Sequence, residues 1–323
     1  VVVFDTLRRF FNHLGYKVIY VSNYTDVDDR IIEKAQKTNK KETEISEFYI
    51  EAFADSATKI NALKPTFTPK ATQHIESMIA FIKVLIANGA AYENDGEVFF
   101  RVSKVETYGE LSNVTQDELQ VGARIDANPK KEHPNDFLLW KKTDDAGIKW
   151  DSPWGAGRPG WHTECVVMIN DIFGKPLIDI HGGGFDLKFP HHENEIAQAR
   201  AYANTGLANY WMHNGFINLN NQKMAKSTGN FVTAKDFIEE YGATSLRLLL
   251  LSTHYRSPVN LSAEIIENTN NEVLRLQRTK QALVRHFALH PLKVTDDSLL
   301  LKFEEALADD LNTPNALSEL YAV

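Results

Sequence analysis

The sequence predicts an α/β fold in which a parallel sheet is interrupted by an inserted region and followed by an α-helical region. Three observations support this prediction. Residues 17–22 (KVIYVS) form a short β-rich run that leads into a polar turn and a helical pattern, which is one strand-to-helix unit of an α/β sheet. From Ala91 the apolar residues no longer follow helical spacing, and turn-forming residues recur as far as Pro134. From Ser262 onward, apolar residues return to helical spacing.

Boundary residues support the individual elements. Gly15 follows a first helical pattern, Asp28 and Asp29 stand where a second helix would begin, and Gly89 ends another. The run Asn94-Asp95-Gly96 predicts a hairpin turn. The predicted helices cover residues 1–16, 31–35, 44–63, 69–88, 190–203 and 262–289, with a further helical region from 297. The predicted strands cover residues 17–22, 177–181 and 210–213. The last two strands are expected to be parallel.

Length and composition limit the possible classes of protein. A chain of 323 residues should hold two or three domains, because single cores stop growing at roughly 250 to 300 residues. The net charge of -8 argues against a uniformly basic nucleic-acid-binding protein, although a local basic face can still hold phosphates. No run approaches the roughly 20 apolar residues of a membrane helix. A single cysteine cannot form an internal disulfide, so we expect a cytoplasmic protein with no membrane partner.

Both ends of the sequence have the pattern of a truncated chain. Val1 is not preceded by Met, and the first residues lack the charged region and cleavage site of a signal peptide. At the other end, an apolar helical pattern continues to Val323 with no Gly or Pro stop signal. We therefore expect segments to precede and to follow this sequence in the complete protein.

Polar residues follow the first predicted strand. Asn23, Thr25 and Asp26 lie just beyond it, and ligands in open α/β sheets bind beyond the carboxyl ends of strands, so these residues are pocket candidates. The alternative is a structural turn with an Asp cap, because the same residue types favour turns.

A possible metal site combines the one cysteine with a later helix. Pro190 suits a first helical turn, and residues four apart share a face, so His191 and Glu195 can meet at one point. His192 and Glu195, three apart, can do the same, so the spacing leaves both histidines open. Thiolate, imidazole and carboxylate are normal zinc ligands, and Cys165 would give three of four tetrahedral positions. The alternative for a lone cysteine is a small buried apolar side chain.

Two further stretches carry possible ligand chemistry. The run from His181 to Asp186 (HGGGFD) follows a predicted strand, and its glycines allow a close approach of backbone or ligand, although such a run can also be a flexible turn. Lys223 and Lys226 stand three apart in a polar stretch beside Met224 and Ser227. Two ammonium groups on a loop can neutralise charge on a transferring phosphate, and the alternative is a solvated lysine loop.

Together these stretches resemble one family over nearly the whole chain. KMAKS at 223–227 is similar to the KMSKS signature of class I aminoacyl-tRNA synthetases. GWHTEC, HGGGFDLKFPHHENEIAQ, WMHNGF and NYTDVDD resemble the cysteinyl-tRNA synthetase versions of its pocket. The resemblance implies a Rossmann-like parallel sheet. It also implies a division into domains. Residues 1–90 would form the first part of the catalytic domain, and residues 91–140 an inserted connective region. Residues 141–235 would form the second part, with the zinc site and the lysine loop, and residues 236–323 a helical stem and the start of a C-terminal helical domain.

The resemblance also assigns roles to residues. It implies that Cys165, His191 and Glu195 bind one Zn²⁺ per chain, with a fourth, cysteine ligand before Val1, and this selects His191 over His192. The expected substrate-binding residues are Thr25, Trp161, His181 and Asp186. Lys226 is expected to contact ATP, which would be bound with Mg²⁺, and Lys223 to lie nearby; both are expected to be catalytic.

The sequence departs from the family pattern in two places. Ala225 replaces the serine of the signature, which leaves both lysines in place. The HIGH-type motif that binds ATP is expected before the first helix and is absent, so the stretch as given should not be competent for adenylation. We expect that motif to lie in the same segment before Val1 as the fourth zinc ligand.

The implied function is that of a cysteine–tRNA ligase. Its substrates would be cysteine, ATP and tRNA(Cys), and the product of the first step would be cysteinyl-adenylate. One alternative is a related ligase that joins activated cysteine to an amino sugar; the basic helical segment from Arg275 to Arg285 favours tRNA. The other alternative is a non-catalytic RNA-binding paralogue, which would lack the HIGH-type segment altogether.

Overall fold

The computed structural model describes residues 1–114, 128–224, 231–290 and 297–322. Contacts divide the chain into two compact units. Unit 1 comprises Val1–Ile19, Ala52–Lys64 and His213–Val323, and unit 2 comprises Tyr20–Glu51 and Pro65–Met212. The domain bounds expected from the family resemblance stay a prediction.

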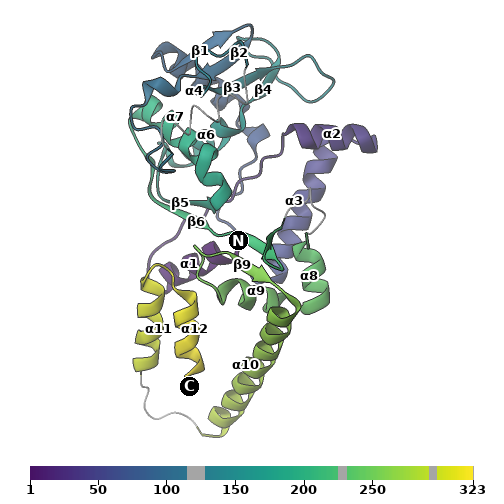
Figure 1. Cartoon of the computed structure of the whole chain (residues 1–323), viewed down its shortest axis with the longest axis vertical. Helices are drawn as coiled ribbons and strands as arrows, with labels where there is room; N and C mark the ends of the chain where they lie inside the picture. The colour runs from purple at the N-terminus through teal and green to yellow at the C-terminus, as the bar shows by residue number, and fades with distance from the viewer. Residues whose placement is uncertain (115–127, 225–230, 291–296, 323) are drawn as a thin grey trace. The chain divides into compact units, whose positions relative to one another are not determined.

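Unit 2 combines an antiparallel sheet, several helices and a second, two-stranded sheet (Figure 1). Its strands are β1 (Ala91–Asn94), β2 (Glu97–Phe100), β3 (Phe137–Lys142), β4 (Gly157–Pro159), β5 (Leu177–Gly184) and β6 (Leu207–Asn214), the last of which ends in unit 1. Its helices are α2 (Asp29–Thr38), α4 (Ile75–Ala87), α6 (Trp161–Phe173), α7 (Glu193–Ala203) and the first part of α3 (Glu42–Lys59), with short turns η1 (Ala71–Gln73), η2 (Val102–Lys104), η3 (Phe185–Leu187) and η4 (Lys188–His192).

The antiparallel sheet is ordered β1-β2-β3-β4 and begins with the predicted hairpin. Asn94 pairs with Glu97 across a two-residue turn in which Asp95 and Gly96 both have positive φ, at 53° and 80°. An Asp-Gly turn of this kind matches the twist of the flanking strands. A side chain at position 96 would meet Lys142 and a backbone oxygen, so glycine is needed there for space as well.

Apolar side chains from this sheet and from three helices share one core. Val98, Phe100 and Trp140 are fully buried on the sheet, and they lie in the same cluster as Met78 of α4 and Val166 of α6. Because Ala197 and Ala199 of α7 join that cluster, the core fixes the helices that carry the candidate metal ligands.

Parallel pairing occurs only in short pieces within the part of the chain that the structure describes. Val21 and Tyr24 form single parallel bridges with Phe67 and Lys70, where the sequence predicted a strand over 17–22. β5 and β6 pair with each other at the predicted positions, each longer than expected. The described fold is therefore mixed α/β with a helical C-terminal part, and most of its regular structure is helix.

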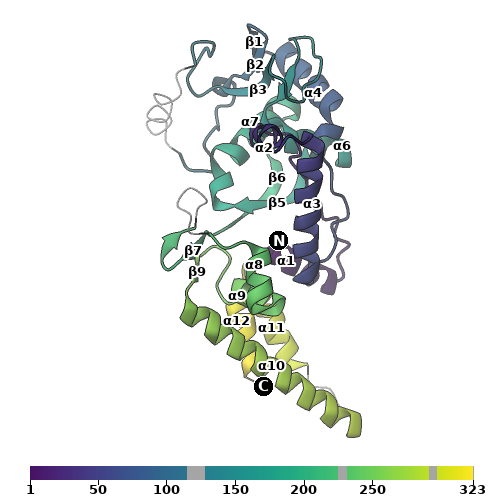
Figure 2. The same ribbon diagram turned by 90° about the vertical axis from the view of Figure 1, so that its right-hand side faces the viewer.

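Unit 1 is mainly helical. It contains a small sheet in the order β8-β7-β9, with β7 and β9 parallel. The unit comprises α1 (Val2–His13), the end of α3, β7 (Ile217–Leu219), β8 (Gln222–Lys223), α8 (Ala234–Tyr241), α9 (Ala243–Leu251), β9 (Val259–Leu261), α10 (Ala263–Leu289), α11 (Ser298–Ala308) and α12 (Thr313–Tyr321). Its core includes Val2, Phe237, Leu249 and Leu261, and α11 and α12 form a hairpin (Figure 2).

Most predicted helices are confirmed. Asp28 caps α2 by accepting a hydrogen bond from the Arg30 N–H, and Ser262 caps α10 by accepting one from Ile265. The helix predicted over 69–88 is shorter and begins at Ile75, after the turn η1. α6 was not predicted. No helix among the described residues has the length and apolar character needed to cross a membrane.

Candidate metal centre and substrate pocket

The start of α6 is positioned by a close approach of backbone to the sheet. Gly160 is the residue before α6, and a Cβ there would lie 2.0 Å from the carbonyl oxygen of Leu138 on β3. Glycine is therefore required for the chain to leave β4 at this distance. As a result, Trp161 and Cys165, one helical turn apart, share a face at the start of α6.

The second set of candidate ligands comes from η4 and α7. Phe189 is extended, so the helical backbone begins after it, near the Pro190 start that the sequence suggested, and the regular α-helix α7 begins at Glu193. His191 and Glu195 nevertheless keep the i, i+4 relation and are 4% and 0% exposed. Both side chains are buried polar groups that require partners.

Cys165, His191 and Glu195 bring their ligand atoms within 4.8 Å of one another. The Cys165 Sγ lies 3.9 Å from His191 Nε2, which lies 2.8 Å from Glu195 Oε1. A second group, made of His181, His192 and Glu195, satisfies the same distance limit and shares the carboxylate. The structure thus brings both histidines close to Glu195, each in a different triad.

The first triad fits a zinc ion on chemical grounds. It offers one sulfur, one nitrogen and one oxygen, a donor set that zinc accepts in tetrahedral sites. Glu195 Oε1 is buried and has no hydrogen-bond partner among the described residues, although His191 Nε2 is only 2.8 Å away. A short contact between two groups that can each ligate a metal is the arrangement expected of ligands that face a common ion. The cluster is consistent with a zinc site.

The charges of the triad are set by burial and by its neighbours. Burial alone would raise the pKa of Glu195, but the imidazoles of His181 and His191 outweigh it and hold that pKa well below the ordinary range. Burial raises the pKa of the Cys165 thiol, and the carboxylates of Glu195 and Glu164 raise it further. Because metal ligands must be deprotonated, binding of a metal at this thiol would release a proton.

Neighbouring side chains orient His191. Its Nδ1 lies 2.9 Å from the Nδ1 of His162, so one of these two nitrogens donates to the other, and Nε2 is left facing Cys165 and Glu195. The Trp161 ring stacks on the His191 ring with centroids 4.0 Å apart. Burial, with the nearby His191, lowers the pKa of His162 to about 4, so His162 is neutral at pH 7.

The carboxylate of Glu195 is held from its other side. The His181 ring contacts Oε2 through Nε2 at 2.7 Å, which leaves Oε1 directed toward His191. A contact of this kind fixes which oxygen a ligating carboxylate presents to a metal.

The polar turn after residue 22 reaches the same site. The Asn23 amide is 3.6 Å from Cys165 Sγ, and the Thr25 hydroxyl donates to Glu164 Oε2 at 2.9 Å. Burial raises the pKa of Glu164 to about 8, against the opposing effect of the Thr25 hydrogen bond. Asp26 accepts from the backbone N–H and the hydroxyl of Thr72, which is the structural turn role that the sequence left open for it.

The predicted site residues are only partly gathered by the structure. Thr25, Trp161 and His181 all contact residues of the first triad or their direct neighbours. Asp186 is exposed in η3, just beyond β5. Lys226 lies outside the described residues, and Lys223 is placed only as a backbone position in β8.

Sequence reasoning missed two members of the cluster, His162 and Glu164, and one pairing, that of His192 with His181. His162 and Glu164 flank Thr163 inside the quoted GWHTEC run, and a signal was present because both are polar residues in a helix that is mostly buried. The pairing of His192 with His181 had no local signal, because it depends on the approach of β5 to η4.

Comparison with known proteins defines the class to which this fold and site belong. The family model described as the tRNA synthetases class I (C) catalytic domain matches residues 1–271, and the DALR domain matches residues 302–323. Methionyl-tRNA synthetase from Mycobacterium tuberculosis, solved in complex with methionyl-adenylate, has a similar fold with a TM-score of 0.75 at 16% identity, over 99% of this chain and 77% of that one. The fold is that of a class I aminoacyl-tRNA synthetase catalytic domain.

The sequence relatives narrow the class. The chain is 47% identical to the cysteine–tRNA ligase of Staphylococcus aureus (strain Newman) and 46% identical to that of Staphylococcus carnosus (strain TM300). Each match covers 98% of this chain and 70% of the relative. The chain therefore belongs to the cysteinyl-tRNA synthetase family. This confirms the family that the sequence predicted and the predicted enzyme class, a cysteine–tRNA ligase.

Proposed function

We propose that this chain selects cysteine at the Cys165/His191/Glu195 centre, activates it with ATP and transfers it to tRNA(Cys). The observation that supports the proposal is the triad of zinc-type ligands, two of them buried, which lies beside Trp161 and the Thr25 turn. The family relationship supplies the reaction class, and the triad supplies a reason why a thiol would be chosen over other small side chains.

In the proposed centre, Cys165, His191 and Glu195 would hold one zinc ion. When bound, zinc supplies a Lewis acid for which a thiolate is a good ligand and a serine hydroxyl, with its much higher pKa, is a poor one. Discrimination of this kind exceeds what one methyl-sized difference in an apolar pocket can give, and it needs no editing site.

The chain's own residues prepare that selection. His181 holds Oε2 of Glu195, and His162 holds Nδ1 of His191, so both ligands keep one orientation. Trp161 covers one face of the His191 ring and limits the access of water to the centre. Thr25, Trp161, His181 and Asp186 are proposed to surround the amino-acid substrate.

The proposed reaction has two steps. The carboxylate of cysteine attacks the α-phosphorus of ATP, which releases pyrophosphate and gives cysteinyl-adenylate, and a terminal tRNA hydroxyl then takes the cysteinyl group and releases AMP. Alignment and charge stabilisation account for most of such an attack at phosphorus. Lys226 and Lys223, with Mg²⁺ on the phosphates, are proposed to neutralise the charge that develops.

The family relationship also supports a finer description of the fold. We infer that the short parallel pieces belong to a Rossmann-like sheet whose halves are residues 1–90 and 141–235, with residues 91–140 as the inserted connective region. Residues 236–323 would then form the stem and the start of the C-terminal helical domain, to which the DALR match at 302–323 corresponds. The proposed setting is the cytoplasm, where a lone thiol stays reduced.

The test uses protein expressed from the complete coding sequence. Labelled cysteine should appear on tRNA(Cys) with ATP present, and removal of zinc with a chelator should lower the preference for cysteine over serine by at least about 100-fold. Zinc-independent discrimination would contradict the role of the centre. Transfer of cysteine to an amino sugar in place of tRNA, or no activation at all, would contradict the proposed reaction.

A matched pair of substitutions tests the choice of histidine. His191→Asn should abolish stoichiometric zinc binding, whereas His192→Asn should lower zinc affinity far less, because Cys165 lies in the triad of His191 and not in that of His192. The reverse result would move the centre to His181, His192 and Glu195.

A further inference from the structure

Gln198 is a polar side chain that the proposed reaction does not use, and its exposed fraction is 0%. It lies on α7 three residues after Glu195, so it shares a helix face with that candidate ligand. Its sequence neighbours Ala197 and Ala199 belong to the apolar core of unit 2. Because a buried amide destabilises a core unless its polar atoms are satisfied, the partners of Gln198 show what the side chain does there.

Both ends of the Gln198 amide contact the start of α6. Oε1 accepts a hydrogen bond from the Thr163 hydroxyl at 2.9 Å. Nε2 donates to the carbonyl oxygen of His162 at 2.7 Å and to that of Asn194, one turn earlier on α7, at 3.1 Å. Carbonyl oxygens can only accept, so the nitrogen has to face them, and the contacts fix which way round the amide lies.

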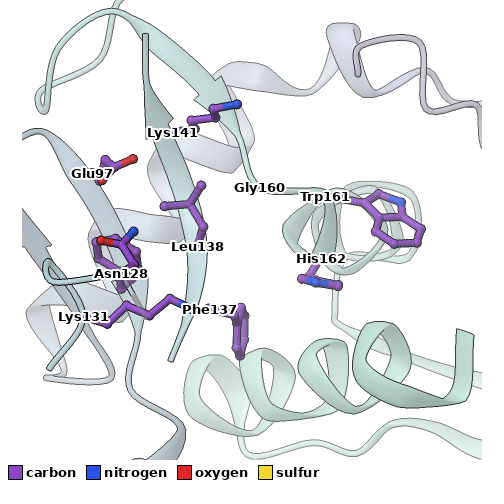
Figure 3. Close-up of a pocket in the computed structure, with 10 residues that line it drawn as sticks. Glu97, Asn128, Lys131, Phe137, Leu138, Lys141, Gly160, Trp161 and His162 are labelled. Atoms are coloured by element: carbon purple, nitrogen blue, oxygen red, sulfur yellow. The ribbon is translucent and has the colours of Figure 1, made fainter. Parts of the chain in front are cut away.

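The residues that Gln198 contacts on α6 stand beside the candidate metal centre. Thr163 comes two residues before Cys165. The ring of His162 places its Nδ1 2.9 Å from Nδ1 of His191. Figure 3 shows the His162 ring beside Phe137 of β3, and the two ring centroids are 5.7 Å apart with the planes at 82°. Gln198 therefore holds the backbone of the residue whose ring orients His191.

The distance between the thiol and the imidazole depends on how α6 lies against α7. Cys165 is carried by α6, whereas His191 and Glu195 are carried by η4 and α7. Apolar contacts such as those in the shared core favour burial without a preferred direction. Hydrogen bonds, in contrast, fix both a distance and an angle. The Gln198 amide thus adds a directional constraint between the two segments that supply the ligands.

We propose that Gln198 is a positioning residue that sets the separation of the two parts of the metal centre, Cys165 on α6 and His191 with Glu195 on η4 and α7. The inference rests on the proposed function, because it concerns the zinc centre proposed there. With the amide in place α6 cannot slide along α7, and the thiol and imidazole are held 3.9 Å apart. Ligands held in this way bind a metal more tightly, because less order has to be created on binding.

The first experiment measures zinc affinity in protein expressed from the complete coding sequence, by competition against a fluorescent chelator. Gln198→Met keeps a similar length and removes all three hydrogen bonds of the amide. Its zinc affinity should fall roughly 10- to 100-fold, as for other groups that orient metal ligands. Equal zinc affinity of Gln198→Met and the unsubstituted protein would overturn the proposal.

A pair of substitutions at Thr163 tests the same contact from the α6 side. Thr163→Val keeps the shape and removes the hydroxyl, so zinc affinity should fall about three- to tenfold. Thr163→Ser keeps the hydroxyl and should restore the affinity. If Gln198→Met does not fold, this pair decides, and equal affinities of the valine and serine variants would contradict the proposal.

A double-mutant cycle tests whether Gln198 and Thr163 act together. Thr163→Val added to Gln198→Met should cause little further loss of zinc affinity, because the acceptor of the hydroxyl is already absent. Additive losses would mean that the two side chains act separately, which the proposed constraint does not allow.

Tyr108→Phe is the matched control for general damage to α7. The Tyr108 hydroxyl donates to Asn194 Oδ1 at 2.5 Å, so this substitution removes a hydrogen bond between α7 and a segment other than α6. It should lower the resistance to urea but change zinc affinity by less than about twofold. A loss of zinc affinity as large as that of Gln198→Met would show that any weakened contact of α7 has this effect, and the proposal would fail.

The second experiment separates the positioning role from a merely structural one. In cysteine-dependent pyrophosphate exchange with excess zinc, Gln198→Met should raise the KM for cysteine about tenfold and leave the KM for ATP nearly unchanged. A residue that only supports the core would lower the amount of active protein, and hence the apparent kcat, without changing either KM. That result would overturn the proposal.

The unsubstituted protein distinguishes this inference from the proposed function. If it binds one zinc ion and discriminates cysteine from serine, but the Gln198 and Thr163 variants do so equally well, the inference fails and the function stands. If it binds no zinc, the proposed centre fails and Gln198 has no ligand set to position.

Discussion

Two buried carboxylates, Glu195 in unit 2 and Asp5 in unit 1, both have a lowered pKa, but they have different partners. Glu195 is 0% exposed and Asp5 4%, and the pKa of each lies below its ordinary value even though burial alone would raise it. The two sites differ in what faces the oxygens.

Asp5 is surrounded by groups that can only donate. The Leu63 backbone N–H donates to Oδ1 at 2.8 Å, and the guanidinium groups of Arg9 and Arg247 donate to Oδ2 at 2.9 and 2.5 Å. Arginine keeps its charge at all accessible pH values, so this arrangement is complete without any ligand. Asp5 therefore joins α1, α9 and the segment around residue 63 into one structure.

Glu195 faces groups that can change state. Two imidazoles and a thiol surround it, and Oε1 has no hydrogen bond from any described residue. Such a set of groups that can each lose a proton is favourable around a cation. A buried carboxylate therefore indicates a functional site when the groups around it can ligate a metal, and a structural site when they are permanent hydrogen-bond donors.

Zinc binding should distinguish the two carboxylates most strongly when each is replaced by its amide. Glu195→Gln should lower zinc affinity by more than about 100-fold, because it removes a charged ligand and not merely a group that orients one. Asp5→Asn should leave zinc stoichiometry unchanged. The measurement is competition for zinc against a fluorescent chelator. Equal zinc affinity of Glu195→Gln and the unsubstituted protein would remove Glu195 from the ligand set.

The residue that orients Glu195 should matter less than Glu195 itself. His181→Ala should lower zinc affinity roughly tenfold, because Glu195 Oε2 loses the contact that fixes its rotamer. His181→Gln retains an N–H that can reach Oε2 and should recover most of that loss. If alanine and glutamine variants bind zinc equally weakly, His181 does not act through this contact.

Asp5→Asn should show its effect in stability. We expect the free energy of unfolding to fall by about 2 kcal/mol, because two guanidinium groups lose their common partner. Urea denaturation followed by far-UV circular dichroism measures this loss. Arg9→Gln is the matched control and should lose less, because Arg9 is the more exposed of the two arginines. An Asp5→Asn protein as stable as the unsubstituted one would show that the donors are satisfied by water.

Acidification should remove the same contribution gradually. The pKa of Asp5 is lowered from its ordinary value of 3.8, so the stability it supplies is fully present above that value and is lost as the pH falls through the lowered pKa. The difference in unfolding free energy between Asp5→Asn and the unsubstituted protein should therefore shrink by about 1 kcal/mol or more between pH 5 and the acid transition. A constant difference would mean that Asp5 does not titrate in this range.

Local sequence determined most of the elements and indicated the three candidate ligands. The Asp-Gly turn at 95–96, the Ser262 cap and the i, i+4 spacing of His191 and Glu195 act over a few residues, so they can be recognised without the fold. α6 escaped prediction because its glycine start depends on contact with Leu138 of β3, a neighbour more than twenty residues earlier in the chain.

Tertiary structure decided how the ligands meet. Cys165 and His191 come from different helical segments, and only the packing of α6 and α7 into one core brings the thiol within 3.9 Å of the imidazole. The roles of His162 and His181 also arise there, because each contacts its partner across separate elements. The sequence by itself determined the ligand types, their helical spacing and the family, since these are encoded by residue identity. The fold alone decided which oxygen of Glu195 and which nitrogen of His191 face the centre, since these depend on the packing of distant segments.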